Sequence, residues 1–320
     1  MGFTSTMITW QLWRAIHTPF VAHPLYYMRG MDPVPEDTQR LTEIMERNTQ
    51  RIALLVILGV IAAVIHYGPA VLLFIIIGVP ISLFLLTVPA VLLLAGTVYG
   101  LIAVMAIALT ISKERHQGRL ELLGATPYGL AGATWALGSI AVQKNILLKR
   151  IRNTLHPLHM ITTFCVIFML ILFMIPYISD PQAIEPRQAL SDVLAVLAVI
   201  IFAIIDLFQS GNIGSLIGMI VATDTHNTAH IQGRSLTTFL VIHLAGYMLI
   251  VGLCVLAWPV LGINSDIVYY GLCLFTAYAI REGITLVLWW FLIKTLDANY
   301  DELNTIVRIG IRRQRTIPHA

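Results

Sequence analysis

Sixty consecutive residues of this chain, from Ile52 to Ile111, contain no Asp, Glu, Lys or Arg. Residues 160–179 and 235–265 also lack Asp, Glu, Lys and Arg. Each run reaches or exceeds the roughly 20 residues that a helix needs to cross the hydrocarbon core of a bilayer. Charged residues make up only 12% of the chain, whereas soluble domains carry about 25%. These runs predict an integral membrane protein.

The uncharged runs are rich in Leu, Ile, Val and Met and show no alternation of apolar and polar residues. Helices satisfy all their backbone hydrogen bonds within one segment, so this pattern favours spanning helices over barrel strands. We therefore predict an all-α, polytopic transmembrane helical bundle of about six spans, within a range of six to eight. The predicted parts are an interfacial or cytoplasmic amphipathic leader (1–51), a first transmembrane hairpin (52–112), a cytoplasmic coupling-type segment (113–157), a second transmembrane group (158–293) and a basic cytoplasmic tail (294–320).

Two stretches leave the number of spans open. Residues 52–112 hold two or three crossings, and we favour two because this keeps the basic leader on the same side as Lys113. Residues 190–223 are long for one straight helix and short for two with a loop. We expect one span here, ending in or broken by the polar, glycine-rich stretch 209–214, which contains Gly211 and Gly214.

The cations predict the orientation. Of the 20 Lys and Arg residues, seven lie within 113–157, five within 1–51 and five after Phe291, whereas the predicted loop 180–187 holds only Arg187. The positive-inside rule then places both termini in the cytoplasm and 180–187 outside, in a bacterial inner membrane. A net charge of +3 gives no reason to expect nucleic acid as a partner.

The leader combines aromatic and basic residues before any spanning run. Trp10 and Trp13 interleave with Arg14 and His17, a mixture typical of a helix that lies among lipid headgroups. A solvated leader is the alternative.

The most specific motif begins where the first charge-free run ends. Lys113, Glu114 and Arg115 stop the run, Gln117 and Gly118 allow a turn, and an apolar short helix follows before a Thr-Pro pair. This segment resembles the coupling segment of type-2 ABC transporter permeases, which docks on the ATPase subunit. A plain interfacial helix is the alternative. The predicted docking residues are Lys113, Glu114, Arg115, Gln117, Gly118, Leu120, Glu121, Leu122, Leu123, Thr126 and Pro127.

The chain contains no Gly-Lys dipeptide and therefore no phosphate-binding loop of the GxxxxGK[ST] type. The resemblance thus implies a permease-like subunit that works with a separate ATPase on an amphipathic or lipid-like substrate, with a homodimer as one arrangement. The alternative is a non-transporting accessory subunit of a photosynthetic or respiratory complex, packed against pigment or quinone proteins. The predicted partners of this chain are a separate ATP-binding subunit or other membrane subunits, and lipids.

Ionisable side chains inside predicted spans form the second candidate site. Such groups are costly in lipid and by default face a partner, a cavity or a path. We expect Asp206 and Arg281 to pair, and Arg281 and Glu282 to point about 100° apart on their helix and find separate partners. The alternative is a last helix broken into two pieces, with both residues at a shallow interface. The intramembrane polar residues are Asp206, Gln209, Asn212, Arg281 and Glu282.

His66 and His243 lie within apolar runs. A neutral imidazole at this depth either ligates a haem iron or a chlorophyll magnesium, or hydrogen-bonds a neighbouring helix. Cys165, Cys254 and Cys273 show no metal-binding spacing. We predict no metal site, no cofactor and no enzymatic activity, because no catalytic constellation is visible.

Overall fold

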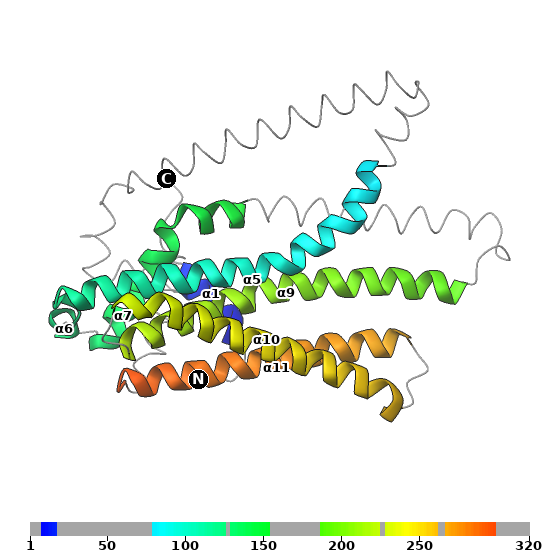
Figure 1. Cartoon of the computed structure of the whole chain (residues 1–320). Coiled ribbons are helices and arrows are strands. Elements are labelled where there is room, and N and C mark those ends of the chain that lie inside the picture. The colour runs from blue at the N-terminus through cyan, green and yellow to red at the C-terminus, as the bar shows by residue number, and fades with distance from the viewer. Residues whose placement is uncertain are drawn as a thin grey trace, which may run out of the picture. The chain divides into compact units, whose positions relative to one another are not determined.

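The computed structural model describes residues 8–17, 79–125, 129–153, 186–224, 228–261 and 266–298. Within these ranges all regular structure is helical (Figure 1). The chain divides into two compact units, one formed by residues 1–30 and 92–320 and the other by residues 31–91. In the second unit the described residues are 79–91, the first part of a long helix. The all-α prediction is confirmed for the described residues.

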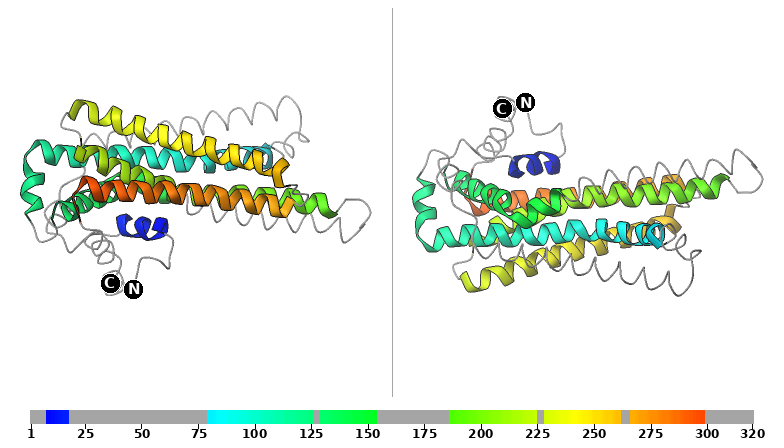
Figure 2. Two further views of the ribbon diagram at one scale, coloured as in Figure 1. Left: turned by 90° about the horizontal axis from the view of Figure 1, so that it is seen from below. Right: turned by 90° about the horizontal axis from the view of Figure 1, so that it is seen from above.

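Four long helices dominate: α5 (Val79–His116), α9 (Pro186–Asp224), α10 (Thr228–Leu261) and α11 (Asp266–Thr295). By length and composition, each contains a segment able to cross a membrane. The views in Figure 2 show α9, α10 and α11 running side by side. The chain is therefore an integral membrane protein with at least these four candidate spans. The predicted span at 160–179, most of the leader and the basic tail after residue 298 lie outside the described residues.

Helix α9 corrects one prediction. It continues through Gly211 and Gly214 to Asp224 without a break, so the glycine-rich stretch does not interrupt the span, and Arg187 belongs to the helix. A Cβ at Gly214 would lie 2.4 Å from the carbonyl oxygen of Gly100 on α5. Small residues let membrane helices approach closely. The glycines therefore permit the crossing of α5 and α9.

The predicted coupling-type segment 113–157 includes a buried helix. After α6 (Arg119–Gly124), helix α7 (Gly129–Lys144) buries twelve consecutive residues, Ala131–Val142. The Trp135 ring packs edge-on against Trp289 of α11, with centroids 5.8 Å apart. The physical reason is visible in the sequence, since no charged residue lies between Glu121 and Lys144. The cations on both sides of this apolar run made the whole of 113–157 appear basic.

Helix α1 (Ile8–His17) is amphipathic as predicted, but its apolar face packs against protein. It contacts α7, α9 and α11, and its buried side chains include Leu12, Trp13 and Ile16. Trp10 and Arg14 remain exposed. Gly211 makes room for this docking, because a Cβ there would lie 2.4 Å from the Trp13 ring.

Candidate functional site

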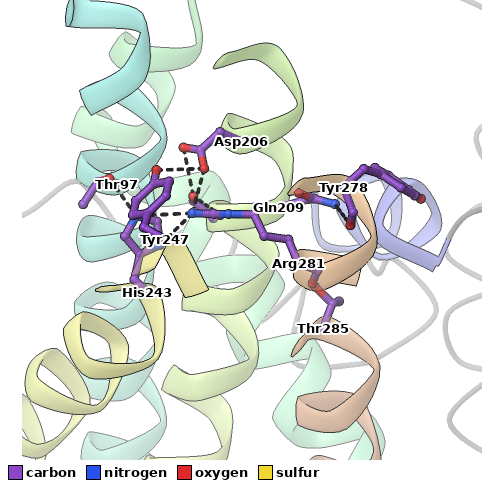
Figure 3. A network of polar contacts seen from close by, with 9 residues as sticks. Thr97, Asp206, Gln209, His243, Tyr247, Tyr278, Arg281 and Thr285 are labelled. Carbon is purple, nitrogen blue, oxygen red and sulfur yellow. Dashed lines mark hydrogen bonds and ion pairs between the residues drawn. The ribbon is translucent and has the colours of Figure 1, made fainter. Parts of the chain in front are cut away.

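A buried ion pair lies at the centre of the bundle. The Nη2 atom of Arg281, on α11, is 2.7 Å from Oδ1 of Asp206 on α9, and both side chains are almost fully buried (Figure 3). Arg281 Nη1 also donates to the Ser210 hydroxyl at 2.9 Å. Helix α11 continues through Gly283. The predicted pair is therefore confirmed, and the alternative of a broken last helix is wrong.

Helix α10 supplies two aromatic neighbours of this pair. The Tyr247 hydroxyl donates to Asp206 Oδ1 at 2.9 Å, and the Arg281 guanidinium lies 4.7 Å from the centroid of the Tyr247 ring. His243 Nδ1 is 3.2 Å from Arg281 Nη2. A cation over an aromatic face is stabilised by the ring quadrupole. Tyr247 thus contacts both members of the pair.

The contacts of His243 favour one tautomer. A guanidinium has only donors, and Nη2 of Arg281 lies nearer to Nδ1 of His243, at 3.2 Å, than to Nε2, at 3.5 Å, which favours Nδ1 as the acceptor and the proton on Nε2. Nε2 is 2.7 Å from the Thr97 hydroxyl of α5, to which it donates. The imidazole is therefore neutral and both of its nitrogens are engaged. These are the contacts that the hydrogen-bonding alternative predicts for His243. His66 lies outside the described residues.

Together these contacts join four helices around one charge pair. Thr97 comes from α5, Asp206 and Ser210 from α9, His243 and Tyr247 from α10, and Arg281 from α11 (Figure 3). A buried charge is tolerated only when it is paired and hydrogen-bonded. The arrangement balances a positive charge with a negative one. It can hold the four helices in a fixed register.

Glu282 faces the other way, as expected from its position next to Arg281. Its carboxylate accepts hydrogen bonds from the backbone N–H of Thr9, at 3.2 Å, and from the Thr9 hydroxyl. The Thr9 carbonyl in turn accepts from the Asn212 amide at 2.6 Å. Gln209 reaches the carbonyl of Tyr278 at 3.4 Å. The predicted polar residues thus split into two groups, and the second one anchors α1 to α9 and α11.

His17 lies at the C-terminal end of α1 and contacts α5. Its Nδ1–H donates to the carbonyl of Trp13 at 2.8 Å, and Nε2 accepts from the Tyr99 hydroxyl of α5. Burial lowers the pKa of His17 to about 4. The hydrogen bond to Trp13 opposes this shift, while the positive charge of Arg152 adds to it. The docked helix therefore holds a neutral histidine.

The predicted docking segment is only partly a free surface. Leu120 is buried, whereas Leu122 is 75% exposed. Glu114 is buried, and Arg115 donates to the carbonyls of Ala222 and Thr223 at the end of α9, where the helix dipole favours a cation. The remaining described residues are Lys113, Gln117, Gly118 and Glu121, which are exposed, and Leu123, which is half-buried. Thr126 and Pro127 lie outside the described residues.

Sequence reasoning missed several partners of these groups. Ser210 lies four residues after Asp206, and Tyr247 lies four residues after His243, so each pair shares one helix face. This spacing was a usable signal. Thr9 and Tyr99 had no such signal, because their partners lie 273 and 82 residues away.

Within the described ranges, no group of three or more His, Cys, Asp or Glu side chains is arranged to hold a metal ion. No family model, curated protein or solved structure matches this chain. The assignment of function rests on the residues described above.

Proposed function

We propose that this chain is a permease-like membrane subunit that works with a separate ATPase, as its resemblance to type-2 ABC transporter permeases implies. The four apolar helices supply a membrane bundle. The 320 residues contain no Gly-Lys dipeptide and so no P-loop, and the proposal assigns the ATPase to another subunit.

The observation that carries this proposal is the geometry of α6. Helix α5 ends at His116, and Gly118 adopts a φ of 66°, which turns the chain sharply into α6. Leu120 anchors α6 against the protein while Leu122 points outward. An exposed apolar side chain on a short, anchored helix suits a partner's groove.

A lipid-like substrate is supported by the sides of the bundle. Helix α10 exposes large apolar side chains along much of its length, including Met248 at 74% and Val260 at 77%. Such a surface contacts acyl chains in a membrane. A substrate with an acyl chain can approach the bundle from within the bilayer.

The test replaces Leu122 by Asp and purifies the tagged full chain from native membranes with its partners. A carboxylate in an apolar contact loses its hydration, so we expect the co-purifying ATP hydrolysis to fall on the order of tenfold. Leu147→Asp is the matched control, because Leu147 is also exposed but lies outside α6. Leu120 is unsuitable, since it is buried and its replacement would disturb the fold. Equal ATPase recovery with both variants would contradict docking through α6.

An accessory role is the second candidate. It is favoured by the ion pair network, whose bonds hold four helices in one register, as a static scaffold needs. An intact native complex that contains no nucleotide-binding subunit, but does contain pigment or quinone proteins, would support this role over transport.

A further inference from the structure

Two free cysteines face each other across the α10–α11 hairpin. Cys254 lies seven residues before the end of α10 at Leu261, and Cys273 lies seven residues after the start of α11 at Asp266. Positions equidistant from the turn of an antiparallel helical hairpin lie at the same height. Helices α10 and α11 pack against each other, and the two thiols interact across them. Neither is bonded to another cysteine in the structure.

The surroundings of the pair are apolar and open. Leu253, Val255 and Phe275 are exposed beside the two cysteines. At 1.5 Å per residue, seven residues place the thiols about 10 Å from the hairpin turn. A reagent that reaches them must therefore be small and able to enter an apolar region.

We propose that Cys254 and Cys273 form a reversible dithiol–disulfide pair that fastens α10 to α11. The bond would bring the two sulfur atoms to the roughly 2 Å of a disulfide. The proposal is independent of any ATPase partner. It concerns the opposite end of α11 from Trp289 and Trp290 and uses no residue of the ion pair network.

The reaction needs a two-electron oxidant, and the position of the pair selects an uncharged, lipid-soluble one, such as a quinone or a diazene. With a diazene, one thiolate adds to the N=N bond. The second thiolate then attacks the first sulfur, the S–N bond breaks, and the nitrogen fragment leaves as a hydrazine carrying both thiol protons. The two sulfurs lose two electrons in total and the oxidant gains them.

The test treats the full chain in native membranes with diamide, an uncharged diazene, and then denatures it for labelling with a maleimide–polyethylene glycol. The chain has three cysteines, Cys165 being the third, so the reduced protein should show three shifts on a gel. We expect oxidation to remove two of the three and to leave the chain monomeric on a non-reducing gel. A phosphine reductant should restore all three.

Single variants assign the bond. In Cys165→Ser, diamide should remove both remaining thiols, whereas Cys254→Ser and Cys273→Ser should each keep both of theirs. Three reactive thiols in the oxidised wild type would overturn the proposal. A loss that involves Cys165, or that appears only as a covalent dimer, would overturn it as well.

Discussion

Arg281 and Asp206 form an ion pair of 2.7 Å in which the two side chains are 2% and 0% exposed. The pair joins the middle of α11 to α9, and Ser210, Tyr247 and His243 complete its contacts. An unpaired guanidinium near the bilayer centre costs on the order of 3 kcal/mol or more. The pair therefore lowers the cost of inserting α11 as one continuous helix.

Removing one member should be worse than removing both. Arg281→Leu leaves a buried Asp206 without its counter-charge, and we expect a loss of about 3–5 kcal/mol in the free energy of unfolding. Asp206→Asn combined with Arg281→Leu should recover part of this loss. Thermal unfolding in detergent measures both.

The matched control for this prediction is Arg234→Leu. Arg234 pairs with Asp224 at 3.0 Å, but both side chains are more than half exposed, so the change should cost at most about 1 kcal/mol. If the double variant at 281 and 206 were no more stable than Arg281→Leu, the two charges would not be coupled.

A second prediction concerns the crossing of α5 and α9. Gly214→Ala places a Cβ 2.4 Å from the Gly100 carbonyl oxygen, and this backbone atom cannot turn aside. We expect a loss of about 1–3 kcal/mol through overpacking. Gly252→Ala is the control, because nothing lies within 4 Å of a Cβ there, and it should be neutral or stabilising by up to about 1 kcal/mol. Equal unfolding temperatures for the two variants would show that the helices do not cross so closely.

The helices, the ion pair and the separate directions of Arg281 and Glu282 could be predicted from the sequence. The length of an uncharged run and the angle between neighbouring residues on a helix both depend on the local sequence alone. The sequence did not reveal that α7 is buried, since the flanking cations led to a cytoplasmic coupling-type prediction for the whole of 113–157. It also misjudged Gly211 and Gly214. A glycine can break a helix, or it can let another helix approach closely. Which of the two applies depends on the residue packed against it, which is Trp13 for Gly211 and Gly100 for Gly214. The docking of α1 depends on Thr9 meeting Glu282, a contact across 273 positions.

A third prediction concerns acid stability. Unfolded His17 takes up a proton near its ordinary pKa of 6.5, whereas the folded form stays neutral down to about 4. Between these values the unfolded state binds more protons, so the stability should fall as the pH drops from about 6.5 to 4. His17→Gln cannot titrate and should show a smaller fall over the same window, measured as unfolding temperature against pH. Parallel curves for the two proteins would place the acid sensitivity elsewhere.

The last prediction concerns orientation. Arg119, in α6, and Val260, near the end of α10, are both exposed, and each can be replaced by cysteine in a variant that lacks the three native ones. The cations gathered at 113–119 and 144–152 predict a cytoplasmic location for this segment under the positive-inside rule. A membrane-impermeant maleimide added to intact cells should therefore label Val260→Cys and not Arg119→Cys. Inverted vesicles should give the reverse pattern. Labelling of both positions from the same side would mean that the α6 end and the α10–α11 turn do not lie on opposite faces of the membrane, and the docking proposed for α6 would lose its cytoplasmic partner.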